Sequence, residues 1–218
     1  MVKDVTTLIK RERQLVSKDA TIREIHHRVK NNLQTVAALL RMQARRIESP
    51  DAKAALKSAM SRVAAIAAVH EILSQAFDEE VVFDDVTDRI LRMVGDVAAT
   101  RGKVRARRYG TFGLIPAAVA TSLSLVITEL CQNAIEHGLK SGTGNVEVHP
   151  IRDGDRLTVR VIDDGIGLPE GFDIADATSL GLSIVKTLVA ELGGELEVGP
   201  NPAGAGAQAV VKLQVRGN

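Results

Sequence analysis

The sequence of 218 residues suits one large domain or two small ones, and its 45% hydrophobic and 25% charged residues are ordinary for a soluble globular protein. A net charge of +1 gives no general argument for a membrane surface or nucleic acid, and Tyr109 with four phenylalanines offers little base stacking, so we expect no nucleic-acid partner. The single cysteine, Cys131, excludes a disulfide within the chain and fits a reducing compartment such as the cytoplasm.

The first third of the sequence predicts a hairpin of two long helices. From about Val5 to Phe77 it contains one proline and no glycine. Ser49 and Pro50 interrupt this stretch and suit the N-cap and first position of a second helix. Because one hairpin cannot bury the apolar stripes of both arms, we expect a homodimer whose two hairpins form a four-helix bundle. On the first arm, the residues spaced as one helical face are Ile22, Ile25, Val29, Leu33, Val36 and Leu40.

From about residue 78 onward, strand and helix patterns alternate. Asp153-Gly154 is a hairpin signal between two of the strands. The pattern predicts an α/β sandwich, a mixed sheet covered by about three helices, and therefore a helical domain at 1–77 followed by an α/β domain at 78–218. The predicted strands are 79–83, 104–110, 145–151, 156–163, 194–199 and 207–215, and the predicted helices are 85–102, 116–138 and 179–194.

Neither a membrane span nor a secretory signal is predicted. The most apolar window, Gly113 to Ile127, is shorter than the ~20 residues that a bilayer requires, and it contains Pro116. The N-terminus is charged almost throughout, unlike a signal peptide.

Two motifs of the second region suggest a nucleotide site. Asp163 ends a predicted strand and is followed by Gly165 and Gly167. Its carboxylate can accept a hydrogen bond from a purine amino group, and the two glycines let a ligand approach the backbone closely. Ser179-Leu-Gly181-Leu182 opens a predicted helix, whose first backbone N–H groups can hold phosphate oxygens. Taken alone, a glycine-rich turn after a strand is as often structural as functional.

A third motif lies on the helix predicted at 116–138. Glu129, Asn133 and His137 are spaced four residues apart and form one row. Carboxylate and amide oxygens suit Mg²⁺ bound together with nucleotide phosphates, although Asn133 could bond locally and His137 could simply favour a helix C-terminus. The sequence contains no P-loop pattern, its glycine spacing misses the dinucleotide pattern, and His70-Glu71 does not extend to the H-E-x-x-H of a zinc protease.

Together these motifs resemble a known family. The N box, G1 box and G2 region of the GHKL ATP-binding fold resemble TELCQNAIEHG, DDGIG and SLGLSIVKTLVAELGG, in this order. The phosphoacceptor box of sensor histidine kinases of the HRxxN type, relatives of the HWE class, resembles HHRVKNNLQ. The resemblance covers the chain from about Ala20. It implies an autophosphorylating histidine kinase that uses ATP and Mg²⁺ and passes its phosphoryl group to an aspartate of a response-regulator receiver domain.

The resemblance also implies roles for single residues. Asn133 would help to hold Mg²⁺, Asp163 would bind adenine, and Glu129 would assist the metal or proton transfer. Two departures from the family pattern concern phosphate binding: Ser179 stands where many members have glycine, and the lid between residues 168 and 178 is short. The expected nucleotide-binding residues are Asn133, His137, Asp163, Gly165, Gly167, Ser179, Gly181 and Leu182.

Helix geometry distinguishes the two adjacent histidines. His26 lies four residues after Ile22 and three before Val29, on the apolar stripe, whereas His27 lies on the polar face. A phosphoacceptor must leave the packed surface to reach a γ-phosphate. We therefore predict His27 as the phosphoacceptor and His26 as a packing residue.

The residues around His27 leave its proton acceptor open. Arg28 stands where the commonest kinase class has an acid, so Glu24 and Glu129 are alternative bases. By the same resemblance, Asn31, one turn after His27, would orient the water that attacks the partner's aspartyl phosphate. Helix geometry fits a plain solvent-facing residue equally well. Two other functions stay open: a GHKL-type serine kinase of the anti-sigma kind, and a non-catalytic dimeric switch that binds ATP.

Overall fold

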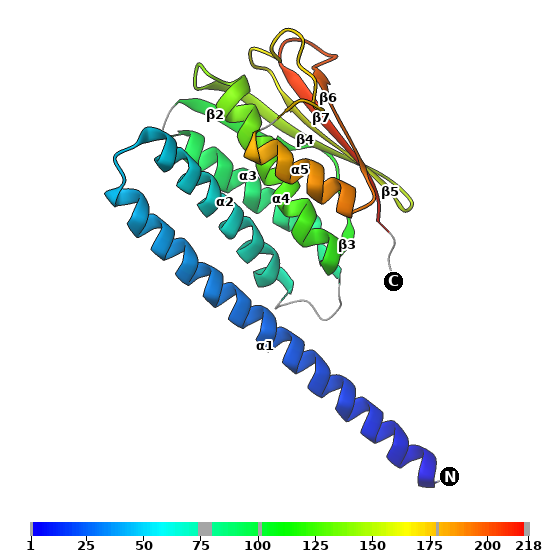
Figure 1. The fold of residues 1–218 in the computed structure, drawn as a ribbon. Helices are drawn as coiled ribbons and strands as arrows, with labels where there is room; N and C mark the ends of the chain where they lie inside the picture. The colour runs from blue at the N-terminus through cyan, green and yellow to red at the C-terminus, as the bar shows by residue number, and fades with distance from the viewer. Residues whose placement is uncertain (1, 74–79, 100–101, 178, 216–218) are drawn as a thin grey trace.

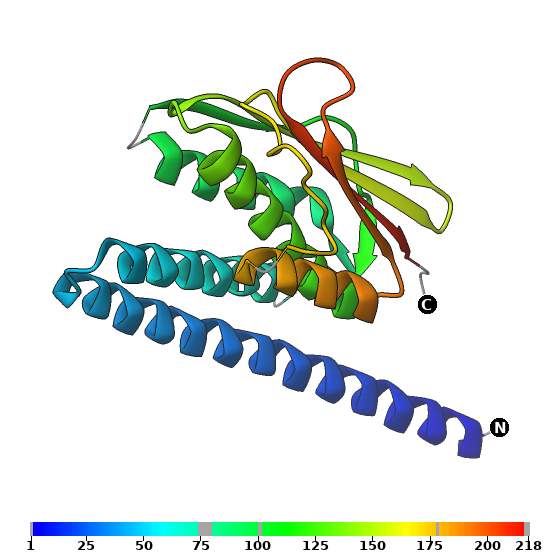
Figure 2. The ribbon, with the colours of Figure 1, turned by 45° about the horizontal axis from the view of Figure 1, so that its top comes forward.

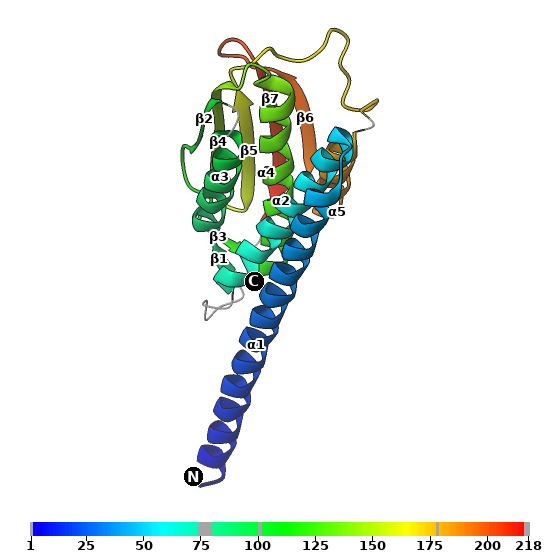
Figure 3. The same ribbon diagram turned by 90° about the vertical axis from the view of Figure 1, so that its left-hand side faces the viewer.

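The computed structural model describes residues 2–73, 80–99, 102–177 and 179–215 (Figure 1). Its first two helices, α1 (Val2–Arg46) and α2 (Pro50–Leu73), form an antiparallel hairpin. The turn follows the predicted chemistry, because Oγ of Ser49 accepts the backbone N–H of Ala52 at 3.4 Å at the start of α2. The N-terminal part of α1 extends well beyond the rest of the molecule (Figure 3).

A five-stranded mixed sheet forms the second part of the chain. The strand order is β2-β4-β5-β7-β6, with β2 parallel to β4 and all other neighbours antiparallel. The predicted hairpin at Asp153-Gly154 joins β4 to β5, and Gly154 has the positive φ of +58° that such a turn favours. The strands are β2 (Lys103–Arg108), β4 (Thr143–Asp153), β5 (Arg156–Asp163), β6 (Glu195–Pro200) and β7 (Ala207–Gln214).

Three helices cover one face of this sheet (Figure 2). They are α3 (Phe83–Ala99), α4 (Ala117–Asn133) and α5 (Leu180–Glu191), and α4 continues as a π-helical turn, η1 (Ala134–Gly138). The hairpin lies against the helical layer, so α2 is sandwiched between α1 and α4 (Figures 2 and 3). The predicted class, a helical hairpin followed by a mixed α/β sandwich, is confirmed.

The core is aliphatic and centres on α4. Leu123, Val126 and Ile127 are fully buried between the sheet and the neighbouring helices. By length and composition alone the segment Ala117–Gly138 could cross a membrane, but 56% of its most apolar window is buried inside the protein, as in the core helix of a globular domain.

One detail differs from the sequence-based expectation, one agrees with it, and one lies outside the described residues. A short strand, β3 (Leu114–Pro116), pairs with β1 (Glu80–Val82), although its residues had been assigned to an apolar window and a helix start. The apolar stripe of α1 is only partly covered in the single chain, since Ile25 and Val36 are 52% and 42% exposed. The boundary expected at residue 77 lies outside the described residues.

Candidate functional site

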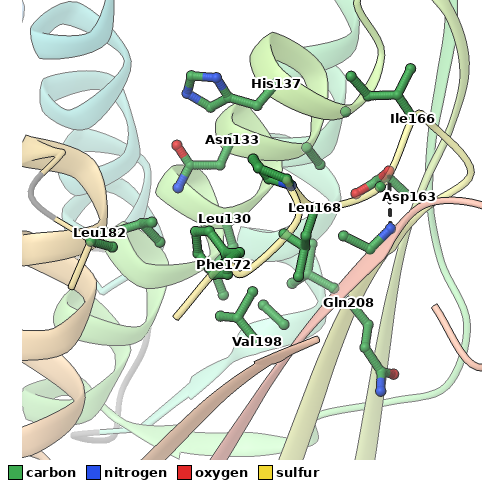
Figure 4. A pocket seen from close by; sticks show the side chains of 18 of the residues that line it. Leu130, Asn133, His137, Asp163, Ile166, Leu168, Phe172, Leu182, Val198 and Gln208 are labelled. Atoms are coloured by element: carbon green, nitrogen blue, oxygen red, sulfur yellow. Dashed lines mark hydrogen bonds between the residues drawn. The ribbon is translucent and has the colours of Figure 1, made fainter. Parts of the chain in front are cut away.

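A cavity of about 600 Å³ lies between α4, α5 and the sheet, closed on its outer side by the segment that joins β5 to α5 (Figure 4). Its walls are mainly apolar, with a few polar groups that converge on the cavity, as expected for a small-molecule site. Residues that line it include Leu130, Asn133, His137, Lys140, Asp163, Ile166, Gly167, Leu168, Phe172, Ser179, Leu182 and Val198.

Asp163 lies at the end of β5 and is only 6% exposed. Its Oδ1 accepts the backbone N–H group of Gly165 at 2.9 Å and that of Ala207 at 3.3 Å. Figure 4 shows the bond to Ala207. Burial raises the pKa of Asp163 above its ordinary value; these two bonds oppose the rise, and the nearby charge of Asp164 adds to it. Among the described residues both bonds end on Oδ1, so Oδ2 is left to accept from a ligand.

Glycine is required where the β5 loop meets the end of α4. A Cβ on Gly138 would lie 2.7 Å from Oδ1 of Asp163, and a Cβ on Gly165 would collide with the backbone of Gly138. The backbone N–H of Ile166 donates to the carbonyl of Gly138 at 3.0 Å, which fixes this close approach. Gly167 has a φ of +79°, a left-handed conformation that favours glycine.

Asn133 and His137 reach the cavity from α4 and its π-helical turn (Figure 4). Nδ2 of Asn133 is buried and has no hydrogen-bond partner among the described residues. A buried donor without a partner is unfavourable, and an oxygen of a bound ligand would satisfy it. This amide therefore fits a site that is completed by phosphate or by a hydrated metal.

Glu129 precedes Asn133 by one turn but points to the hairpin. It is 2% exposed, and both of its oxygens are bound by the guanidinium of Arg62, with Nε–Oε1 at 2.5 Å and Nη2–Oε2 at 2.9 Å. The start of α5 lies close by, since a Cβ on Gly181 would be 2.8 Å from Oε2 of Glu129. Asn133 thus faces the cavity while Glu129 is held in an ion pair beside it.

The lid and the start of α5 close the remaining side. Ser179 is the N-cap of α5, and its Oγ accepts the backbone N–H of Leu182 at 3.4 Å, so the departure from glycine supplies a helix cap. Nζ of Lys186 donates to the carbonyl oxygens of Ala175 at 3.0 Å and Ala177 at 3.3 Å. These bonds tie the short lid to α5.

Among the lining residues that were not predicted from the sequence, Lys140 and Phe172 are of particular interest. Lys140 follows Asn133 by seven residues and lies in the turn after η1, just beyond the predicted helix end. Phe172 lies in the lid. The only sequence signal for it was that phenylalanine is rare in this chain, which has four. Lys140 adds a cationic side chain to the cavity wall, which suits an anionic ligand.

The two adjacent histidines have different environments. His26 is half-buried, and its Nδ1 lies 2.9 Å from Nδ1 of His70 on α2. Burial lowers the pKa of both rings, and the charge of a neighbouring imidazole lowers each further. His27 is exposed, and so is Asn31. Arg28 forms an ion pair with Glu24 at 2.8 Å and lowers the pKa of that carboxyl.

The structure therefore brings six of the predicted residues to the cavity wall and sets three beside it. The lining residues are Asn133, His137, Asp163, Gly167, Ser179 and Leu182, and the adjacent ones are Glu129, Gly165 and Gly181. His27 and Asn31 lie on α1, apart from the cavity.

The cavity of this α/β sandwich combines a strand-end aspartate, a glycine-rich loop and an asparagine on the central helix. This combination defines a nucleotide-binding domain of the GHKL class. Residues 118–217 match the family of histidine kinase-, DNA gyrase B- and HSP90-like ATPases, and residues 24–98 match a histidine kinase family. The chain belongs to the histidine kinases, as its motifs indicated.

Similar proteins support this assignment. The chain is 50% identical over 218 residues to the sensor histidine kinase PdtaS of Mycolicibacterium smegmatis, a match that covers 99% of this chain and 44% of that protein. It is 27% identical over 187 residues to blue-light-activated histidine kinase 2 of Erythrobacter litoralis, covering 83% of this chain and 53% of that one. The solved histidine kinase domain of Erythrobacter litoralis EL346 superposes with a TM-score of 0.67 at 25% identity, covering 93% and 94% of the two chains. The chain thus spans less than half the length of its mycobacterial relative.

Proposed function

We propose that this chain is the kinase core of a two-component sensor that phosphorylates itself on His27. An imidazole nitrogen of His27 would attack the γ-phosphorus of ATP, forming an N–P bond as the bond to the bridging oxygen breaks and ADP leaves. The phosphoryl group would then pass to an aspartate of a response-regulator receiver domain. The observation that carries the proposal is an exposed histidine, within a segment that matches histidine kinases, in the same chain as a GHKL-type cavity.

The cavity suggests how ATP would be held. Oδ2 of Asp163 would accept the adenine amino group, and the unpartnered Nδ2 of Asn133 would donate to the phosphate region. Lys140 would add positive charge near the phosphates, and the imidazole of His137 would lie beside them. Mg²⁺, when bound through the Asn133 amide oxygen, would neutralise charge on the phosphates. Glu129 can assist only after its ion pair with Arg62 opens.

The contacts on α1 support His27 rather than His26 as the acceptor. The Nδ1 atom of His26 is engaged with His70, and its ring is half-buried. His27 and Asn31 are exposed one turn apart, where a receiver domain can approach both. In this role Asn31 would orient water toward the receiver's aspartyl phosphate.

The proposal also includes assembly and location. Large apolar side chains on α1 are exposed, with Leu39 at 56% and Met42 at 57%, as expected for a helix that packs against a second copy of the chain. The lone buried cysteine fits the cytoplasm. We therefore propose a cytoplasmic homodimer through the hairpin.

Labelling with γ-phosphate-labelled ATP tests the function. Acid-labile, base-stable label on the wild type should vanish in His27→Gln, which should still bind ATP because it changes only an exposed side chain. His26→Gln should keep label while weakening the hairpin, and Asn133→Asp should lose label through the nucleotide site. Acid-stable label on a partner protein would point to a serine kinase, and ATP binding without any transfer would point to a switch.

A further inference from the structure

Arg62 and Glu129 join the hairpin to the ATP-binding domain through a buried ion pair. The guanidinium binds both carboxylate oxygens, and the two side chains are only 19% and 3% exposed. On the same seam, Oγ of Ser58 lies 3.4 Å from Oε1 of Gln132. Because Ser58 precedes Arg62 whereas Gln132 follows Glu129, α2 and α4 run antiparallel along this seam.

This contact occupies one of the two carboxylates that could serve the proposed reaction as proton acceptor. With both oxygens bound to Arg62, the carboxylate of Glu129 cannot accept a proton from the attacking imidazole or turn to a metal beside Asn133. The nucleotide cavity is formed in the same conformation, so ATP binding does not depend on opening the pair.

The same docking keeps His27 away from the nucleotide. His26, the neighbour of His27, contacts His70 of α2. Ser58 of α2 contacts Gln132, which precedes Asn133 of the nucleotide site. Along α2, His70 lies twelve residues after Ser58. At 1.5 Å per residue this is about 18 Å along the helix axis. In addition, α2 lies between α1 and α4 (Figures 2 and 3). Reacting atoms must approach to about 3–3.5 Å, so this arrangement does not permit transfer within one chain.

We propose that the Arg62–Glu129 ion pair is a latch that holds the ATP-binding domain on α2 in a conformation unable to phosphorylate the His27 of the same chain. The inference rests on the proposed function, and it adds a regulatory state: ATP binds in the docked form, and transfer follows only when the latch opens. Opening frees the domain to approach His27 and frees the Glu129 carboxylate at the same time.

The physical basis of the latch is the burial of the pair. If Arg62 is removed, the docked form retains a buried carboxylate without its partner, whereas in the released form water solvates it. Release therefore becomes more favourable. The ion pair of Arg89 with Glu71 joins the same two parts of the chain, but Arg89 is 50% exposed, and exposed pairs contribute little. Arg89 thus offers a matched control.

The first test compares initial autophosphorylation rates of Arg62→Met and Arg89→Met at saturating ATP. Arg62→Met should label His27 about tenfold faster or more, because loss of one partner of a buried pair shifts a two-state equilibrium by at least that factor. Arg89→Met should stay within about twofold of the wild type. An Arg62→Met protein that is folded, binds ATP and labels no faster than the wild type would overturn the latch.

The second test locks the docked form. Ser58→Cys and Gln132→Cys together place two thiols on the seam, where a reducible bis-maleimide linker can join them. The native Cys131 does not compete for the linker, because burial raises the pKa of its thiol to about 12. The linked protein should bind ATP normally but lose at least about nine-tenths of its labelling rate. Cleaving the linker with reductant should restore that rate. Ser58→Cys alone, treated identically, is the control. Unchanged labelling in the linked protein would refute the proposal.

Hydrogen exchange separates failure of the latch from failure of the proposed function. Arg62→Met should speed amide exchange along the facing sides of α2 and α4, whether or not any histidine is labelled. If exchange rises but no variant ever labels a histidine, the kinase assignment fails and the interdomain contact stands. If exchange is unchanged, the latch fails, whatever the activity.

Discussion

Asp163→Asn should weaken ATP binding strongly while preserving the fold. The carboxylate accepts N–H groups from Gly165 at 2.9 Å and Ala207 at 3.3 Å through Oδ1, and an asparagine carbonyl oxygen can accept the same pair. The loss falls on Oδ2, which becomes an NH₂ group that, in the proposed binding mode, would face the amino group of adenine. A hydrogen bond to a charged group contributes about 1.5–3 kcal/mol. The affinity for ATP should therefore fall about 10- to 150-fold.

The same substitution should not reduce the stability of the nucleotide-free protein. Burial raises the pKa of Asp163, so at neutral pH the ionised carboxylate is less favourable in the folded state than in the unfolded state. Replacing it with a neutral amide of the same shape removes that cost. An unchanged or higher Tm together with a lower affinity would separate nucleotide recognition from folding.

Calorimetric titration with ATP, alongside thermal unfolding, measures both effects. Asp164→Asn is the matched control: this neighbouring carboxylate is exposed, accepts the N–H and Nδ2 groups of Asn145 at 2.7 and 2.6 Å, and does not line the cavity. Its ATP affinity should stay within about twofold of the wild type. The assignment of Asp163 is wrong if Asp163→Asn binds ATP as tightly as the wild type, or if both variants lose affinity equally.

Two further predictions concern the hairpin. The pKa values of His26 and His70 are lowered by burial, so the folded state binds fewer protons than the unfolded state, and stability should fall as the pH drops below the ordinary value of 6.5 toward the lowered values. In thermal unfolding between pH 8 and 5, His70→Gln should lose less stability than the wild type. An equal loss of stability in the two proteins would contradict this account. Leu39→Glu places a charge on the exposed apolar face of α1 and should weaken a hairpin dimer at least about tenfold, as measured by sedimentation. The control Gln43→Glu changes an exposed site that is already polar and should leave the dimer unchanged. A wild type that stays monomeric at micromolar concentration would refute the dimer.

The elements that were predicted correctly carry their signals in a few adjacent residues. Ser49 and Pro50 end one helix and start the next, and Asp153-Gly154 joins two alternating strands. β3 (Leu114–Pro116) has no such local signal. Its strand conformation comes from pairing with β1, about thirty positions earlier, and its apolar residues read equally well as the start of α4.

The polar part of the cavity was predictable because several of its residues belong to short motifs at element ends. Asp163 ends a strand, Ser179 starts a helix, and Asn133 lies at the end of α4. The state of Glu129 was not predictable. Its partner Arg62 lies 67 positions earlier, and their contact depends on how the hairpin docks, which no local pattern encodes. The bond between His26 and His70, 44 positions apart, has the same origin.

The separation of the paired histidines follows from helix rotation. Successive residues of an α-helix turn by about 100°, so one step along α1 moves a side chain from the seam with α2 to solvent. His26 therefore meets His70, and because both rings present Nδ1 to each other at 2.9 Å, one must donate and the other accept. Such a bond requires at least one neutral ring. A phosphoryl group on His26 would bring its negative charge into this half-buried seam, whereas on His27 the same charge would stay in water. The hairpin would thus keep its packing if the adjacent histidine gained and lost a charged group, which is the property that the proposed phosphoacceptor role requires.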